Sequence, residues 1–194
     1  MTVTALPLTN SIDIGAAEGA VRDLLHALGQ DADSAHLRDT PRRVAAAYTE
    51  LLTPQQFTPT TFANDERYDE LVVARGIPFS SLCEHHLLPF VGTASVAYLP
   101  GDRILGLSKL ARVVQMFAAG LQVQERLTCQ VADWLEDTLA PKGAGVVIEA
   151  EHMCMRIRGV RSAGGSAVTS ALRGALRDDP STRAEFLAIA GISR

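Results

Sequence analysis

The chain has 194 residues, of which 47% are hydrophobic and 21% charged, with a formal net charge of −4. This length and composition are typical of one globular domain with a sizeable core and a smaller appendage. The acidic balance argues against a nucleic-acid-binding protein, since such proteins usually carry a basic stripe. The N-terminus lacks the basic start and apolar core of a secretory signal, and no apolar run approaches the roughly 20 residues that cross a bilayer. The sequence therefore predicts a cytoplasmic protein without nucleic-acid or membrane partners.

The first part of the chain is predicted to be helical after a short disordered tail. Residues 1–12 are rich in threonine and predict that tail. Apolar residues at helical spacing predict a helix over residues 15–28, and Gly29 follows as its C-terminal stop. Thr40 and Pro41 predict a second helix, as its N-cap and its first helical residue. The two helices are expected to form an antiparallel pair.

The rest of the chain predicts an α+β fold. In chain order we expect two strands, two helices and two further strands: 71–80, 93–99, a helix capped by Ser108, a helix over 123–139, one or two strands over 146–160, and a strand near Val168. This order places the two helices on one side of an antiparallel sheet. We assign residues 13–66 to an N-terminal helical region that ends in a polar loop, and residues 67–194 to the catalytic domain.

Two clusters of metal-binding side chains stand far apart in the sequence. Cys83 and His86 are three residues apart between two predicted strands, so both can reach one tetrahedral metal ion. In the second cluster, the strand period of two places His152, Cys154, Arg156 and Arg158 on one face. Two cysteines and one histidine leave the fourth position of a zinc ion free for water, as in catalytic sites. The sequence therefore predicts one catalytic Zn²⁺ per subunit, bound by Cys83, His86 and Cys154.

Each of these features also has a simpler interpretation. A Cys-x-x-His pair recurs by chance, a single histidine is more often only hydrogen-bonded, and a cysteine on a strand is more often a core residue. The metal hypothesis depends on the two clusters occurring together. The third cysteine, Cys129, lies in a helical pattern away from any histidine and is predicted to be a small core residue.

Basic residues near a predicted helix start indicate an anion site. Lys109 and Arg112 occupy one face of the helix that Ser108 is expected to cap, and a helix N-terminus attracts anions. Arg43, Arg158 and Arg161 are further candidates for the same anion. Any one of these basic residues is more often a solvated surface charge.

Glu125, which follows Gln124 at the next helix start, allows two interpretations. Its carboxylate can simply complement the helix dipole. It can also accept hydrogen bonds from a donor edge such as that of guanine. The spacing alone does not decide between them.

Six motifs resemble, in order and with nearly matching spacing, those of the GTP cyclohydrolase I family: SLCEHHLLPFVG, VAYLP, GLSKLARVVQMFA, LQVQERLTCQ, HMCMRIRGV and TSALRG. The likeness is strong from about residue 76 to 186, and DTPRRVAAAY extends it into the N-terminal helices. It implies the tunnelling fold, whose subunits pair their sheets around a ring. It also implies a homodecamer of two pentamers with active sites between subunits.

The resemblance assigns roles to individual residues. Cys83, His86 and Cys154 fall on the zinc ligands, and His85 and His152 on catalytic histidines. The remaining matches are substrate-binding positions: Glu125 with Gln124 for guanine, Ser108 near the ribose, and Lys109, Arg112, Arg158 and Arg43 for the triphosphate.

The implied reaction is zinc-dependent hydrolysis of GTP to 7,8-dihydroneopterin triphosphate and formate, the first step of tetrahydrofolate or pterin biosynthesis. Zinc-activated water attacks C8 of guanine while His85 protonates a ring nitrogen. The ribose then opens, rearranges and recloses, with His152 as the candidate proton shuttle.

Three other functions compete with this one. A zinc nucleobase deaminase would carry Pro-Cys-x-x-Cys, and no Cys-x-x-Cys occurs here. A structural zinc module would close the metal with a fourth protein ligand, for which only His85 or His152 is at hand. A non-catalytic or retuned member of the same scaffold is the third, and retention of the whole residue set argues against loss of activity.

Overall fold

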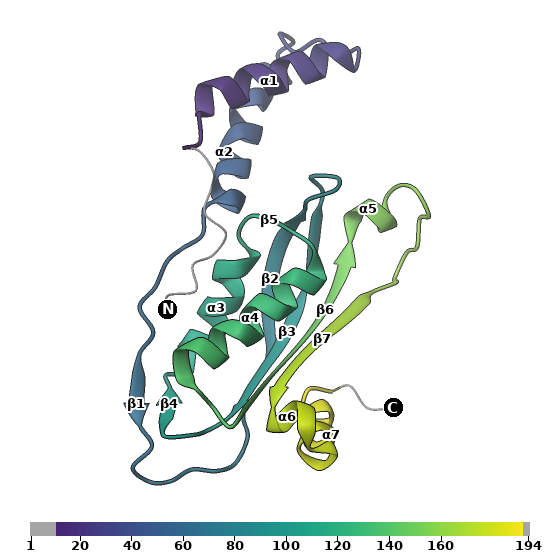
Figure 1. Ribbon diagram of the computed structural model, residues 1–194. Coiled ribbons are helices and arrows are strands. Elements are labelled where there is room, and N and C mark those ends of the chain that lie inside the picture. The colour runs from purple at the N-terminus through teal and green to yellow at the C-terminus, as the bar shows by residue number, and fades with distance from the viewer. Residues whose placement is uncertain (1–10, 192–194) are drawn as a thin grey trace. The chain divides into compact units, whose positions relative to one another are not determined.

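The computed structural model describes residues 11–191, and the chain divides into two compact units (Figure 1). The first unit ends at Thr53 and the second begins at Pro54. Nearly all of the predicted disordered tail, residues 1–12, lies outside the described residues. Within residues 11–191, no helix combines the length and the apolarity that crossing a bilayer requires.

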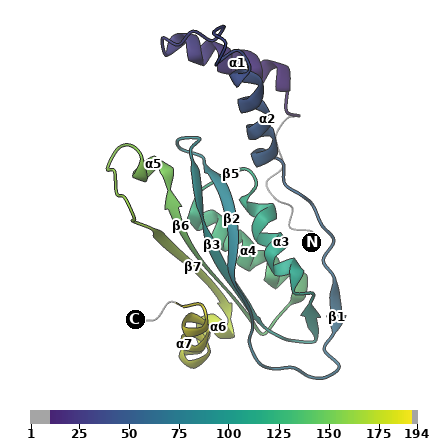
Figure 2. The ribbon, with the colours of Figure 1, turned by 180° about the vertical axis from the view of Figure 1, so that it is seen from behind.

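The first unit contains helices α1 (Ile14–Ala27) and α2 (Thr40–Leu52). The Asp13 carboxylate caps α1 by accepting a hydrogen bond from the backbone N–H of Ala16 at 2.9 Å. Gly29 follows α1 with φ 74°, a left-handed conformation that suits the predicted helix end. The expected antiparallel pairing is not what the ribbon shows, because α1 lies across α2 in both views (Figures 1 and 2).

The beginning of α2 differs from its prediction by one residue. Thr40 is the first helical residue and Asp39 holds the N-cap position, without a capping side-chain hydrogen bond. Asp39 instead pairs with Arg43 one turn later, at 3.4 Å between carboxylate and guanidinium. Such an exposed i,i+4 pair contributes little to stability.

The second unit contains seven strands and five helices within the described residues. The strands are β1 (Thr61–Ala63), β2 (Val72–Cys83), β3 (Pro89–Leu99), β4 (Arg103–Leu105), β5 (Leu121–Gln122), β6 (Gly143–His152) and β7 (Ala167–Gly174). The helices are α3 (Ser108–Ala118), α4 (Gln124–Leu139), α5 (Met153–Arg156), α6 (Ala175–Asp178) and α7 (Pro180–Ile189).

The main sheet has the order β5-β2-β3-β6-β7, and its neighbours are antiparallel except for the parallel pair β2–β5. The predicted succession of strands and helices is present as β2, β3, α3, α4, β6 and β7, which confirms an α+β fold. Residues 54–66, grouped by the sequence prediction with the N-terminal helices, lie in the second unit, where β1 pairs with β4.

Helices α3 and α4 cover one face of the sheet (Figures 1 and 2). Each helix buries an apolar stripe against the sheet: Leu110, Val113, Val114 and Phe117 on α3, and Leu127, Val131, Trp134 and Leu135 on α4. Each such side chain contributes roughly 1.5–3 kcal/mol relative to an exposed one. This packing fixes the end of α3 and the start of α4, which lie next to the candidate site described below.

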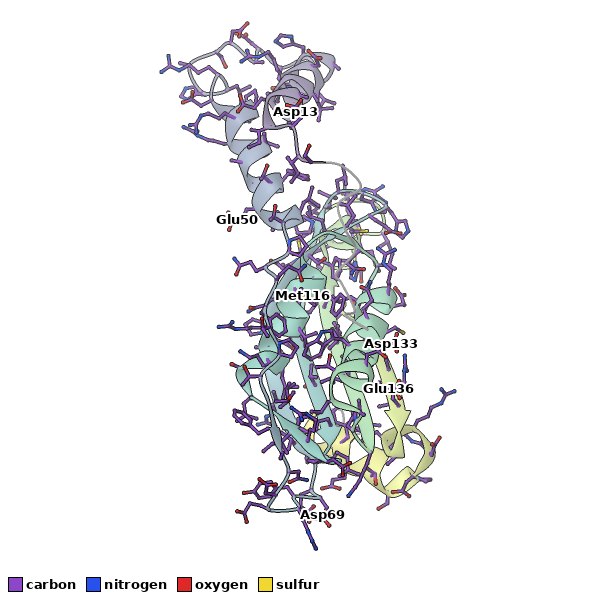
Figure 3. All side chains as sticks on the ribbon, turned by 60° about the vertical axis from the view of Figure 1, so that its left-hand side comes forward. Asp13, Glu50, Asp69, Met116, Asp133 and Glu136 are labelled. Carbon is purple, nitrogen blue, oxygen red and sulfur yellow. The ribbon has the colours of Figure 1, made fainter. Side chains whose placement is uncertain are left out.

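The outer side of α4 is polar. Asp133 and Glu136 lie there (Figure 3), and both pair with Arg173 of β7, at 2.7 and 3.6 Å. Cys129 is one turn earlier on the same side and is exposed, so its prediction as a core residue is wrong. The error arose because apolar character was assigned to the side chain without considering which side of the helix it occupies.

Helices α6 and α7 bury a smaller apolar cluster against the sheet. Leu176 and Phe186 are fully buried there with Ala97 and Val147. Gly145 makes room for the ring, because a Cβ at that position would lie 2.8 Å from an edge carbon of Phe186. The sequence prediction did not include these helices.

Phe186→Ala is expected to destabilise the second unit by about 3–5 kcal/mol, because it removes a buried ring and leaves a cavity that rigid strands do not refill. Denaturant unfolding of the purified variant measures this cost. Ile189→Ala, at a partly exposed position of the same helix, is the matched control and should cost less than about 1 kcal/mol. Equal costs for both variants would show that α7 does not depend on this ring.

Candidate metal centre and surrounding site

Strand register brings the two distant clusters to one end of the sheet. Phe90 pairs with His152 across β3 and β6, so β6 ends beside the turn that joins β2 to β3. Strand β5 pairs Cys83 at the end of β2 with Gln122, immediately before α4. The β2–β3 turn, the end of β6 and the start of α4 therefore lie close together, near β5 and α5 in Figure 1.

Cys83, His86 and Cys154 form a group whose ligand atoms all lie within 4.8 Å of one another. The Cys83 sulfur is 3.7 Å from Nδ1 of His86. Zn–S bonds of about 2.3 Å and Zn–N bonds of about 2.0 Å place tetrahedral ligand atoms roughly 3.5–3.8 Å apart. Both cysteines are buried and the histidine is exposed. The donor types and their spacing therefore fit a zinc ion.

Cys154 reaches this group by a route that the sequence prediction missed. It does not continue the strand, because β6 ends at His152 and α5 forms a single helical turn, closed by a bond from Ile157 N–H to the Met153 carbonyl at 3.2 Å. The strand alternation assigned to residues 152–158 is therefore wrong. Strand β7 stops pairing at Ala150, so beyond His152 the chain has no sheet partner to keep it extended.

The environment of Cys154 is set by burial and by its neighbours. Burial and the adjacent Cys83 sulfur raise the pKa of the Cys154 thiol, and the positive charge of Arg158 opposes that rise. The Arg158 guanidinium also donates to the Cys154 carbonyl at 3.3 Å. The metal-free thiol therefore holds its proton, and a metal ion that binds there must displace it.

His85 adjoins the group without being one of its three members. Its Nδ1 is 3.8 Å from the Cys83 sulfur, and its ring meets that of His86 edge to face with centroids 6.2 Å apart. The side chain is exposed. This position leaves the His85 imidazole available to a bound molecule.

His152 is held on its face and on one edge. Its ring stacks on Phe90 with centroids 4.7 Å apart and planes 1° from parallel, and Nε2 lies 2.8 Å from the side-chain oxygen of Gln124. Burial lowers the pKa of His152, and the carboxylate of Glu125 opposes that shift. The imidazole is therefore neutral at neutral pH. Phe90 was not among the predicted site residues.

An ion pair ties the β2–β3 turn to α4. The Arg126 guanidinium lies 2.5 Å from the Glu84 carboxylate, and it also donates to the Gln122 side chain and the Leu121 carbonyl, at 2.9 and 2.8 Å. Glu84 lies between Cys83 and His85 in the sequence. The sequence prediction missed this pair, although each partner lies inside one of the quoted motifs.

Three predicted substrate-binding residues lie away from the metal-ligand group within one chain. Ser108 begins α3 but is not its cap, since Leu107 holds that position and makes no side-chain capping bond. The other end of α3 adjoins β2, where the Ser81 hydroxyl donates to the Ala118 carbonyl at 2.6 Å. A helix of 11 residues is about 16 Å long. Ser108, with Lys109 beside it, therefore lies about one helix length from that contact, and Arg112 about one turn closer.

The remaining predicted residues are divided between the two units. Glu125 and Arg158 lie beside His152 and Cys154, respectively. Arg43 belongs to the first unit. Gln124 is buried, and its amide is bound within the fold.

Comparison with known proteins gives one consistent family. A sequence profile described as GTP cyclohydrolase I matches residues 17–191. GTP cyclohydrolase 1 of Rhodopirellula baltica is 49% identical over 185 residues, covering 93% of this chain and 80% of the relative. The Mycobacterium leprae protein of that name is 48% identical over 191 residues (96% and 93%), and that of Mycolicibacterium vanbaalenii 51% over 186 residues (92% and 91%).

Among solved structures, the apo form of the archaeosine synthase QueF-Like aligns with a TM-score of 0.43 at 14% identity, covering 61% of this chain and 97% of that one. That likeness is too weak to carry an argument. The sequence matches are much stronger, and they define the protein as an enzyme, a hydrolase that acts on cyclic amidine C–N bonds. The chain belongs to the GTP cyclohydrolase I family. The resemblance drawn from its motifs is thereby confirmed.

Proposed function

We propose that this enzyme uses one Zn²⁺ per subunit to convert GTP to 7,8-dihydroneopterin triphosphate and formate, the first step of tetrahydrofolate or pterin biosynthesis. The observation that carries the proposal is the group of Cys83, His86 and Cys154, with ligand atoms within 4.8 Å of one another. A zinc ion held there supplies Lewis-acid activation of water for attack on C8 of guanine. Three ligands instead of four support a catalytic site over a structural one.

His85 is the proposed general acid of the first hydrolysis. Attack at C8 is difficult while the imidazole ring of guanine remains aromatic, so a proton delivered to a ring nitrogen lowers the barrier. Histidine is the side chain most often used for such transfers. The exposed ring, 3.8 Å from the Cys83 sulfur, supports this role for His85.

His152 is proposed to move protons in the later steps. Release of formate leaves a diamine, and the ribose then opens, rearranges to a ketone and recloses on that diamine. These steps need a group that takes a proton from one substrate atom and returns it to another. A neutral imidazole held in a fixed orientation suits the task, and His152 is held in this way by Phe90 and Gln124.

Glu125 is proposed to recognise guanine. Its exposed carboxylate lies in the first turn of α4, close enough to His152 to influence that residue's pKa. A carboxylate can accept two hydrogen bonds side by side, which matches guanine N1–H and its exocyclic amine.

The triphosphate is proposed to bind Lys109, Arg112, Arg158 and Arg43, with Ser108 near the ribose. Arg158 adjoins the metal-ligand group, whereas the α3 residues lie away from it within one chain, so another subunit would supply them. We therefore propose a homodecamer of two pentamers in the tunnelling fold, with active sites at subunit interfaces. Exposed apolar side chains of Ile157, Val160 and Val168, near the β7 edge, support packing against a neighbour.

The cellular setting follows from the same proposal. GTP is the substrate and the location is cytoplasmic. The net charge of −4 supports the absence of nucleic-acid partners, and we propose no membrane partner.

Purified protein incubated with GTP is expected to form a pterin, followed by absorbance, and an equal amount of formate. Removing the metal with a chelator should abolish both products, and adding Zn²⁺ after the chelator is removed should restore them. Mg²⁺ added alone is the control and should not restore activity, because cysteine and histidine ligands favour zinc. Full turnover by verified metal-free protein would refute zinc dependence, and GTP consumption without formate would refute the reaction.

A further inference from the structure

Gln124 is a buried amide whose orientation is determined by its surroundings. Its side chain is 2% exposed at the start of α4. Its nitrogen lies 3.0 Å from the Ile148 carbonyl, 2.9 Å from the Ala167 carbonyl and 3.2 Å from the Thr169 hydroxyl. Carbonyl oxygens only accept hydrogen bonds, so the amide NH₂ must face β6 and β7. The amide oxygen is then the atom that faces His152.

This orientation determines the tautomer of His152. The Gln124 oxygen lies 2.8 Å from His152 Nε2, and an amide oxygen cannot donate. The hydrogen of that contact therefore belongs to Nε2, and the lone pair of the neutral imidazole lies on Nδ1. Phe90 prevents the ring from turning over freely by stacking on its face.

We propose that Gln124 is a positioning residue that holds His152 in its Nε2–H tautomer and thereby makes Nδ1 the atom that exchanges protons with the substrate. The proposal rests on the proposed role of His152.

The same geometry argues against the guanine-binding role that the family resemblance implies for Gln124. Both hydrogens of its amide are directed at acceptors within the fold, and its oxygen is engaged by His152. The adjacent Glu125 is exposed and keeps the base-recognition role. The two neighbouring residues therefore have separable effects on kinetics.

Gln124→Met tests the proposal, because methionine has nearly the same length and neither donates nor accepts a strong hydrogen bond. We expect kcat to fall about tenfold or more, since a catalytic histidine in the wrong tautomer loses much of its activity. The KM for GTP should stay within about threefold, because no substrate contact is lost.

A double-mutant cycle separates this role from a merely structural one. In a His152→Ala background, Gln124→Met should lower kcat by less than about twofold, because the residue it positions is already absent. An equal loss of kcat in both backgrounds would overturn the proposal. A raised KM for GTP with unchanged kcat would also overturn it, because that result would indicate that Gln124 binds guanine. A His152→Ala enzyme with normal kcat would instead refute the proposed function of His152, so the two failures are distinguishable.

Two further variants control for folding. Thr169→Val removes one acceptor of the same amide but leaves the contact with His152, and its kcat should stay within about twofold of wild type. If circular dichroism shows that Gln124→Met is unfolded, Gln124→Leu replaces it, since leucine also removes the contact with Nε2 and the same fall in kcat is expected. Unchanged kcat in a folded, zinc-loaded Gln124→Leu enzyme would overturn the proposal.

Discussion

Cys154→Ser is expected to lose nearly all bound zinc and to reduce formate release from GTP by at least about a hundredfold. A serine hydroxyl stays protonated near neutral pH and cannot replace a thiolate as a zinc ligand. The substitution is nearly isosteric, so the buried turn that carries residue 154 should keep its structure. Metal analysis of the purified variant and a formate assay measure the two effects separately.

The matched control for this prediction is Cys129→Ser. Cys129 is also a free cysteine, but it is exposed on α4 and stands outside the metal-ligand group. Its variant should keep one zinc per subunit and full turnover. Cys83→Ser should behave like Cys154→Ser, because both thiols belong to the group. Stoichiometric zinc together with full activity in either ligand variant would show that the ligand assignment is wrong.

Periodicity predicted the elements that pack most regularly. The apolar stripes of α3 and α4 repeat at helical spacing, and they are the buried sides of these helices. Strand β5 was missed because two residues carry no detectable pattern; it is defined only by pairing with the end of β2. Helices α6 and α7 were missed for a similar reason, since they are short and Leu176 and Phe186 bury only a narrow apolar side.

The sequence correctly predicted that Cys83, His86 and Cys154 lie together, but part of the predicted geometry was wrong. Cys154 was placed with His152 by strand alternation, yet it lies on α5, a helical turn formed where the strand loses its partners. Local sequence does not reveal where the pairing of a strand ends, because that depends on the length of the neighbouring strands. The side-chain types predicted the group better than strand alternation did, since two thiols and an imidazole suit the same metal whatever the backbone conformation.

The roles of polar side chains near the group were harder to predict. Gln124 and Glu125 are adjacent in the sequence and were given one shared task. The structure separates them, because one amide is buried between strands and the neighbouring carboxylate is exposed. The supporting pair Glu84–Arg126 joins residues 42 positions apart and could be recognised only once β5 placed α4 beside the turn.

His85→Ala is expected to lower kcat by roughly 10²–10⁴-fold while leaving one zinc bound per subunit. The separation of the two effects follows from the position of His85, which adjoins the Cys83 sulfur but is not one of the three ligands. Steady-state kinetics with GTP and metal analysis test it together. His26→Ala, an exposed histidine in the first unit, is the control and should change neither quantity.

The zinc content of the His85→Ala enzyme also decides between an open and a closed metal site. A structural site is closed by four protein ligands, and His85, beside the Cys83 sulfur, is a candidate for the fourth. If His85 were that ligand, its removal would weaken zinc binding as strongly as the loss of Cys154 does. Retained zinc with lost turnover would assign His85 to proton transfer, whereas lost zinc would make the site structural and leave the chemistry without its proposed acid. Normal turnover would exclude both roles.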